Sequence, residues 1–224
     1  MHALLRPRWI FGHVLAAGAI VGFVALGLWQ LDRHAEKLEL RDAVAAGQAL
    51  PPVALDEAAE GSFRRVVTVG AYDGALQTLV LRSRNGVSGY HVLTPLVTEG
   101  GLAVLVDRGW IPLDAPAPAP PEGRVEANGV LWPAEEGSSV PGSLPGVARR
   151  IDPEIVQRFA PYRLRTDYLV LAGDPVPGQF PIPTRPSAIG LGPHLGYAGQ
   201  WVLFALVVAI GYPLVLRKAR RTSA

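Results

Sequence analysis

The sequence contains no cysteine among its 224 residues. This absence excludes a disulfide-stabilised scaffold, a thiolate zinc site, an iron–sulfur cluster and a cysteine nucleophile. Charged residues are also scarce, at 18% of the chain against about 25% in an average soluble domain, whereas hydrophobic residues make up 49%. The chain is therefore unusually apolar, and its length suits a modest domain with membrane anchors.

The sequence also shows none of the short motifs that mark common enzyme classes, such as GxSxG, the P-loop or HExxH. Gly190, Gly192 and Gly196 have the wrong spacing for a dinucleotide-binding loop. Asp107 and Arg108 are adjacent on a predicted strand and so point to opposite faces, which favours separate structural roles over a shared catalytic one. Because no nucleophile–base pair or metal constellation is evident, we expect a protein that is not an enzyme.

Two long stretches, residues 9–31 and 195–216, carry no Asp, Glu, Lys or Arg. About 20 apolar residues in a helix span a bilayer. Trp9 and Trp29 bracket the first stretch, at positions where aromatic residues prefer the headgroup level. A signal peptide cleaved near Ala16–Ala19 is the alternative, but its apolar region would be shorter than this run. We therefore predict two transmembrane helices.

The distribution of charge predicts their orientation. All 19 acidic residues lie between Asp32 and Asp174, whereas both ends of the chain are basic. By the positive-inside rule, residues 1–8 and 217–224 are cytoplasmic and residues 32–194 form an extracytoplasmic domain. The basic residues at the ends are Arg6, Arg8, Arg217, Lys218, Arg220 and Arg221.

The net charge of +2 is too small to indicate a nucleic-acid partner, so the lipid bilayer is the partner that this charge pattern predicts. Arginine outnumbers lysine by 19 to 2, a bias typical of a high-GC bacterial genome. We therefore expect a multi-pass protein of a bacterial plasma membrane with both termini in the cytoplasm.

The residues between the spans first continue a helix and then turn to strands. Alternating charges predict a solvated helical extension over 32–46, ended by Gly47 and the Pro51-Pro52 pair. A β-rich region follows over 62–172, with Asn85-Gly86 as a hairpin turn. Strands are expected at 64–72, 78–84, 91–97, 102–110 and 163–171, one short helix at 152–159 and an extended proline-rich loop at 115–121.

The fold class predicted from these elements is an α+β membrane protein. Two antiparallel transmembrane helices form a hairpin around an extracytoplasmic, antiparallel β-rich domain, a small barrel or sandwich with short helices. Gly18 and Gly22, four residues apart on the first span, predict a close helix contact within the hairpin or with a partner.

Histidine is the one residue type left that could hold a metal or a haem iron. His91 starts a strand, and we expect it to be a structural hydrogen-bonding residue. His13 lies in the first span and is either functional or directed toward the cytoplasmic surface. His34 lies in the helical extension, and His194 at the outer start of the second span, beside an apolar interface where a flat hydrophobic cofactor could lie.

Four segments of the chain match one known set of motifs in order. They are Gly27–Lys37 (GxWQxxRxxxK), Gly89–Leu96 (GYxVxTPL), Val104–Pro112 (ending VDRGWIP) and Pro193–Trp201 (PHLGYAGQW). With these segments and two predicted spans, the chain resembles the surfeit locus protein 1 family, the cytochrome c oxidase assembly factors. It departs from the family pattern at Asp107, where Asn is usual, at Glu36, where an aromatic residue often stands, and at Gly192-Pro193, which replaces Asn residues.

The resemblance implies a non-catalytic assembly factor of the respiratory chain, a chaperone that handles haem a for subunit I of the haem-copper oxidase. It implies that His194 is the axial ligand of a transiently bound haem iron. If a second histidine binds the iron, we expect His34, because it lies on the same side of the membrane as His194. Arg33 would then pair with a haem propionate. The implied neighbours of the haem are Trp29, Gln30, Arg33, Tyr197 and Trp201.

Two alternatives differ in class. One is an accessory or protein-binding subunit of the oxidase or respiratory supercomplex, which contacts other subunits or assembly factors and has no cofactor of its own. The other, a membrane-tethered enzyme, is disfavoured by the missing catalytic constellation. The positions of the histidines add a constraint: His13 lies roughly 24 Å along a helix from Trp29, so His13 and His194 cannot ligate one iron.

Overall fold

A computed structural model describes residues 7–135, 146–174, 176–184 and 190–222 of the chain. The chain forms two compact units. We call residues 1–41 with 189–224 the helical unit and residues 42–188 the sheet unit. Of the predicted segments, the cytoplasmic N-terminus 1–8 falls mostly outside the described residues.

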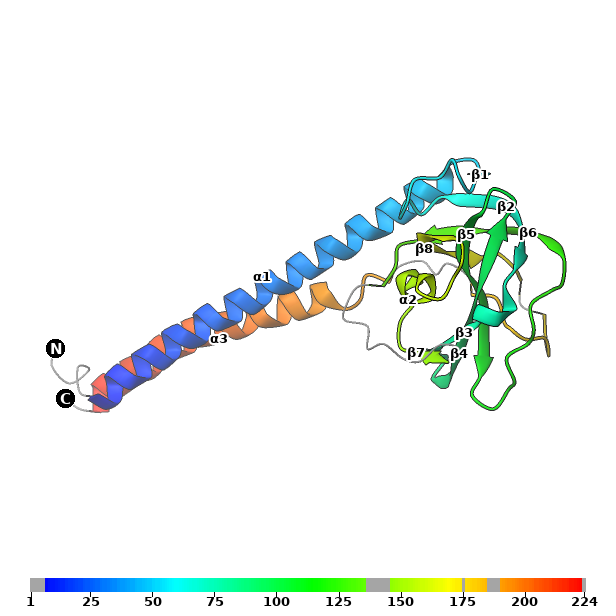
Figure 1. Cartoon of the computed structure of the whole chain (residues 1–224). Coiled ribbons are helices and arrows are strands. Elements are labelled where there is room, and N and C mark those ends of the chain that lie inside the picture. The colour runs from blue at the N-terminus through cyan, green and yellow to red at the C-terminus, as the bar shows by residue number, and fades with distance from the viewer. Residues whose placement is uncertain (1–6, 136–145, 175, 185–189, 223–224) are drawn as a thin grey trace. The chain divides into compact units, whose positions relative to one another are not determined.

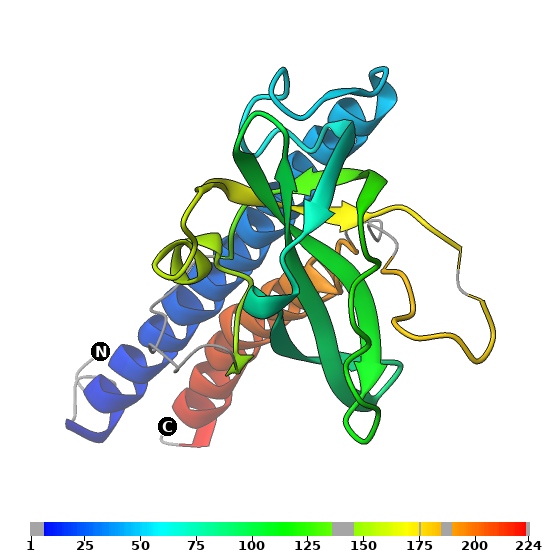
Figure 2. The same ribbon diagram turned by 45° about the vertical axis from the view of Figure 1, so that its right-hand side comes forward.

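The helical unit contains a hairpin of two long helices, α1 (Pro7–Ala49), whose last turns belong to the sheet unit, and α3 (His194–Thr222). Figures 1 and 2 both show α1 and α3 running side by side in opposite directions. Side-chain contacts join them at both ends, from His194 to Gln30 and from Tyr212 to His13. The predicted antiparallel hairpin is therefore present.

Both helices are long and apolar enough to cross a membrane, and the predicted spans 9–31 and 195–216 lie within them. Almost none of the most apolar stretch of either helix is buried. Phe11, Val21 and Ile210 are among the large side chains left exposed. An apolar surface of this extent needs an apolar environment, as the hydrocarbon core of a bilayer provides, so the helices fit a membrane protein.

The helical extension runs three residues further than predicted and ends at Ala49, before the Pro51-Pro52 pair. The prediction that Gly47 ends the helix is wrong, because Gly47 lies inside it. A Cβ at this position would lie 2.5 Å from the carbonyl oxygen of Ser62. Glycine is needed here because the backbone at Ser62 crosses close against the helix.

The sheet unit is built on one eight-stranded sheet with the order β1-β2-β6-β8-β5-β4-β3-β7. Strand β2 also pairs with β4, which closes a ring through β2, β6, β8, β5 and β4. The predicted small barrel therefore fits this topology. The strands are β1 (Val53–Ala54), β2 (Arg65–Tyr72), β3 (Thr78–Arg84), β4 (Val87–Thr98), β5 (Leu102–Pro112), β6 (Arg124–Trp132), β7 (Val147–Ala148) and β8 (Arg163–Leu171).

The prediction of an antiparallel sheet is wrong, because the sheet is mixed. Strands β5 and β8 pair in parallel, as do β1 with β2 and β3 with β7. The parallel pair β5–β8 joins strands separated by residues 113–162, a connection that includes β6 and a short helix, α2 (Pro153–Gln157). A crossover of this length permits parallel pairing, which a short hairpin does not.

The turn and the short helix that were predicted from a few neighbouring residues are present in the structure. Asn85 and Gly86 both have positive φ, of 52° and 80°, so the predicted hairpin turn between β3 and β4 is confirmed. Asp152 caps α2 by accepting a hydrogen bond from the Glu154 backbone N–H at 3.1 Å. A 3-10 turn, η2 (Gly74–Leu76), connects β2 to β3.

The core of the sheet unit follows β5, whose residues 103–111 are all buried. One cluster fills the ring and includes Val66, Leu96 and Leu131. A second cluster packs against the other face and includes Val156 of α2 and Ile151, which precedes that helix. Because β5 is covered on both faces, its charged residues have to find partners inside the protein.

Candidate functional site

His194 is the first residue of α3, and its side chain reaches across to α1. Its Nδ1 lies 2.8 Å from Oε1 of Gln30. A carboxamide oxygen only accepts, so the imidazole donates its Nδ1–H in this bond. In the neutral ring, the lone pair that could bind a metal is then on Nε2.

The turn before His194 explains how the chain tolerates Gly192 in place of Asn. Gly192 has a φ of +64°, in the left-handed region that Gly and Asn adopt more readily than other residues. A Cβ at Gly192 would lie 3.1 Å from Nε2 of His194. The carbonyl of Pro193 accepts a hydrogen bond from the Tyr197 backbone N–H at 3.1 Å, which begins the helix.

The predicted aromatic neighbours divide into two kinds. Trp29 and Tyr197 are 52% and 48% exposed, so their rings are available to a ligand or to lipid. Trp201 instead contributes to the hairpin, because its ring stacks on Phe23 with a centroid distance of 5.7 Å. Gly27 is buried beside it, and a Cβ there would lie 3.7 Å from the Trp201 Cβ and from the Ala198 carbonyl oxygen, which is an ordinary contact distance.

The charged and histidine candidates on α1, Arg33 and His34, both follow Gln30 by about one helical turn. Nη1 of Arg33 pairs with Oε2 of Glu36 at 2.7 Å, at an exposed position. His34 follows Gln30 by four residues, on the same helix face. It is half-buried, and within the described parts of the chain its Nδ1 has no hydrogen-bond partner.

His13 lies far from His194, as predicted. Its Nδ1 is 2.8 Å from the Tyr212 hydroxyl, near the other end of α3, and the two rings meet edge to face. His13 therefore stabilises the hairpin at the end opposite His194. Among the described residues, no group of three or more His, Asp or Glu is arranged to hold a metal ion.

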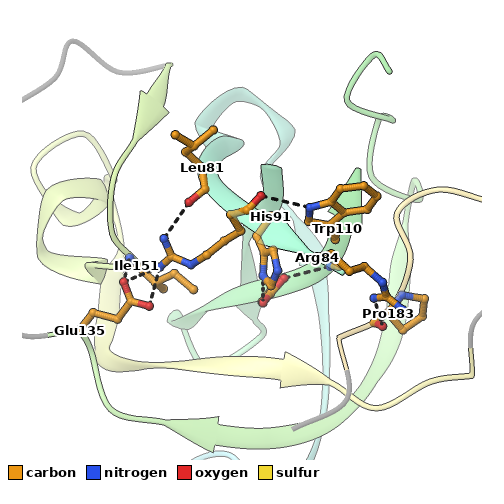
Figure 3. Close-up of polar contacts among 10 residues, drawn as sticks. Leu81, Arg84, His91, Trp110, Glu135, Ile151 and Pro183 are labelled. Carbon is orange, nitrogen blue, oxygen red and sulfur yellow. Dashed lines mark hydrogen bonds and ion pairs between the residues drawn. The ribbon is translucent and has the colours of Figure 1, made fainter. Parts of the chain in front are cut away.

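Two of the four sequence motifs meet in the sheet unit. Gly89 on β4 lies against Trp110 on β5, and a Cβ at Gly89 would lie 2.5 Å from the indole ring. The indole Nε1 donates to the Arg82 carbonyl at 3.3 Å (Figure 3). The Trp110 backbone N–H donates to the Ile182 carbonyl at 2.8 Å, and the Ile182 N–H donates to the Trp110 carbonyl at 2.7 Å. This motif therefore also holds the backbone at Ile182 against β5.

His91 and Asp107 form a side-chain pair between the same two strands. Nδ1 of His91 lies 2.7 Å from Oδ2 of Asp107, which is 2% exposed (Figure 3). The other carboxylate oxygen accepts the Gly109 backbone N–H at 2.9 Å. His91 is therefore a structural hydrogen-bonding residue, as predicted, and Asp107 supplies it with an acceptor.

The comparisons with known proteins agree with these motifs. The family model described as "SURF1 family" matches residues 17–206. This chain belongs to the SURF1 family. It is 30% identical over 230 residues to an uncharacterized SURF1-like protein of Mycobacterium bovis, covering 93% of this chain and 83% of that protein. An uncharacterized SURF1-like protein of Mycobacterium tuberculosis gives the same values.

A vertebrate relative is matched over a shorter stretch. Surfeit locus protein 1 of Takifugu rubripes is 30% identical over 132 residues, which cover 47% of this chain and 55% of that protein. The SURF1 family is known generally as a family of oxidase assembly factors rather than of enzymes. The resemblance found in the four motifs is thus a family relationship.

In this SURF1-family chain, Arg108 is a core residue of the sheet unit. Its guanidinium donates to Gln77 Oε1 at 2.8 Å and to the carbonyls of Pro118 and Ala119 at 3.0 Å each. Burial lowers the pKa of Arg108 from its ordinary value, although arginine remains charged at neutral pH. Arg108 and Asp107 have different partners, as expected for neighbours on a strand, and the proline-rich loop supplies acceptors for Arg108.

Sequence reasoning missed a buried charge pair on β8. Arg165 and Asp167 on β8 are 6% and 1% exposed and share two hydrogen bonds, at 2.7 and 2.9 Å. Arg165 also donates to the carbonyls of Leu55 and Ala58, and Asp167 accepts the Gly61 backbone N–H. The sequence did offer a signal for this pair: two residues that are two positions apart on a strand place their side chains on the same face.

Proposed function

We propose that this protein is a membrane-anchored assembly factor of haem-copper cytochrome c oxidase that holds haem a at His194 for delivery to subunit I. The observation that carries the proposal is the hydrogen bond from His194 Nδ1 to Gln30, because it leaves Nε2 as the nitrogen for an axial bond to iron. Haem a is the cargo of this protein rather than a resident cofactor.

The residues around His194 have the chemistry that a haem requires. Trp29 is next to Gln30 in the sequence and Tyr197 follows His194 on α3, and the exposed rings of both offer apolar surface. Arg33 can bind a propionate by exchanging its exposed partner Glu36 for the haem carboxylate, because an exposed ion pair is weak. A single histidine ligand suits a carrier, since a site with one protein ligand releases its cargo more readily than a site with two. His34 remains the proposed partner should a second ligand bind.

The proposed setting is the plasma membrane of a bacterium. Residues 9–31 and 195–216 would span the bilayer, both termini would lie in the cytoplasm, and the sheet unit would lie outside. A phosphatase reporter fused after residue 224 is then expected to be inactive, and one inserted near Gly137 active. Gly137 lies outside the described residues. An active phosphatase at the C-terminus would refute this topology.

The outer faces of the hairpin support contact with a partner helix. A Cβ at Gly18 or Gly22 would meet nothing within 4 Å, whereas one at Gly12 or Gly27 would meet atoms of α3, so the hairpin contact does not run through Gly18 and Gly22. Small residues on a free helix face allow another helix to approach closely. This observation equally favours the second candidate function, an accessory subunit that binds oxidase helices and carries no cofactor.

An absorption spectrum separates the two candidates. The full chain is purified in detergent from cells that make haem a, together with the variants His194→Ala and His13→Ala. We expect the wild type and His13→Ala to carry haem, and His194→Ala to lose it or to shift its spectrum. Wild-type spectrum and stoichiometry in His194→Ala would refute the ligand assignment. A wild-type protein without haem, still bound to oxidase subunits, would favour the accessory subunit.

A further inference from the structure

We infer that Gln30 is a positioning residue that fixes both the tautomer and the ring orientation of His194. This inference rests on the proposed function, since it assigns Gln30 a role toward the haem that His194 would hold. Gln30 would not touch the iron. It would act through the imidazole, as hydrogen-bond partners of metal-binding histidines do.

The packing of the two helices determines where the Gln30 side chain lies. Gly27, one turn earlier on α1, is buried against α3, where a Cβ would be 3.7 Å from the Ala198 carbonyl oxygen and from the Trp201 Cβ. Phe23, a further turn back, stacks on the Trp201 ring. With these contacts fixing one face of α1, Gln30 comes up opposite the first residue of α3.

The chemistry of the amide selects one protonation pattern. A neutral imidazole can carry its proton on either nitrogen. Oε1 of Gln30, 2.8 Å from Nδ1, favours the tautomer with the proton on Nδ1 and leaves the Nε2 lone pair free. Both side chains are half-buried, so solvent water competes only partly for this bond. Without it, the ring could rotate about its side-chain bonds and populate the other tautomer.

Three substitutions test this role. Gln30→Met keeps the length of the side chain and removes the acceptor, whereas Gln30→Glu keeps an acceptor and strengthens it. Gln200→Met is the matched control, because Gln200 is exposed on α3. Circular dichroism of each purified full-length variant checks that the helices and the sheet unit are intact.

The first measurement needs no haem. Nitrogen NMR of the haem-free protein, labelled at histidine and with His194 assigned by its loss in His194→Ala, reports which ring nitrogen carries the proton. We expect Nδ1 to be protonated in wild type, Gln200→Met and Gln30→Glu, and a mixture of tautomers in Gln30→Met. Predominant protonation of Nε2 in the wild type would overturn the inference directly.

The second measurement uses haem a as the probe. Loss of a hydrogen-bond partner behind a metal ligand weakens metal binding by about 10- to 100-fold, so Gln30→Met should bind haem a at least about tenfold more weakly than Gln200→Met. Gln30→Glu should retain binding and lower the reduction potential of the haem, because a carboxylate makes the imidazole a stronger electron donor.

The outcomes separate the two proposals. Equal haem affinity and equal potential in Gln30→Met and Gln200→Met, with haem bound to the wild type, would overturn the role of Gln30 and leave the proposed function standing. A wild type that binds no haem a would overturn the proposed function, and the role of Gln30 toward haem with it.

Discussion

Replacing Arg165 with methionine should destabilise the sheet unit more than any change of an exposed charge. The guanidinium makes two bonds to Asp167 and one each to the carbonyls of Leu55 and Ala58. Methionine keeps the aliphatic stem but removes all four bonds. Of its bonds within the described parts of the chain, the Asp167 carboxylate, 1% exposed, would then keep the one from the Gly61 backbone N–H.

The magnitude follows from leaving one member of a buried ion pair without its partner, which costs about 3–5 kcal/mol. For a domain of this size, each kcal/mol lowers Tm by about 2–4 °C. We therefore expect Arg165→Met to lower the Tm of the sheet unit by roughly 10 °C. The carbonyls that lose their donor are those of Leu55 and Ala58, whose side chains belong to the core cluster. Loosening of this segment should therefore add to the loss of stability.

The assay is thermal unfolding of the full-length protein in detergent, followed by near-ultraviolet circular dichroism. Arg163→Met is the matched control, because Arg163 is exposed on the same strand. The double variant Arg165→Met with Asp167→Leu should recover much of the loss, since it removes both charges together. A Tm for Arg165→Met within about 1 °C of that for Arg163→Met would refute this account of the pair.

Two further predictions concern the sheet unit. Burial and the hydrogen bond to Asp73 raise the pKa of Tyr162, so the unfolded chain loses this proton first and stability should fall as pH rises above the ordinary tyrosine value of about 10. In chemical denaturation, Tyr162→Phe should flatten that fall and cost about 1–2 kcal/mol at pH 7. An unchanged alkaline slope in Tyr162→Phe would count against this account. Gly89→Ala would place a Cβ 2.5 Å from the Trp110 ring and should lower Tm clearly. Gly100→Ala is the control and should change Tm little, because a Cβ there would have its nearest neighbour at 3.9 Å. Equal Tm values for the two variants would contradict the packing argument.

The elements that could be predicted from the sequence are those with a local cause. An uncharged run of 22 or 23 residues is long enough for a membrane span by its length and composition alone. Asn and Gly both favour positive φ, which Asn85 and Gly86 adopt in the turn. Strand β6 was not predicted because Asn128-Gly129 interrupts its apolar pattern. Gly129 stays in the strand because its missing side chain lets the Val170 carbonyl of β8 approach, a reason that lies in another strand.

The same limit applies to the candidate site. The type and position of His194 could be read from the sequence, since a histidine at the start of an apolar span is unusual. Its contact with Gln30 could not, because the two residues lie on different helices and their meeting depends on how far α3 is shifted along α1. That shift is set by packing at Gly27, Phe23 and Trp201, which no local pattern reports.

The four motifs combine in pairs, and the pairs have different consequences. Gln30 and His194 bring the first and last motifs together in the helical unit, whereas Gly89 and Trp110 bring the middle two together in the sheet unit. Substitutions in the middle pair should therefore lower stability and leave the spectrum of each folded, haem-loaded molecule unchanged. Substitutions at Gln30 should change that spectrum or the haem potential at nearly unchanged Tm. On the proposed function, the motif set thus has two separable roles: the middle pair folds the sheet unit, and Gln30 positions His194 as the proposed haem ligand.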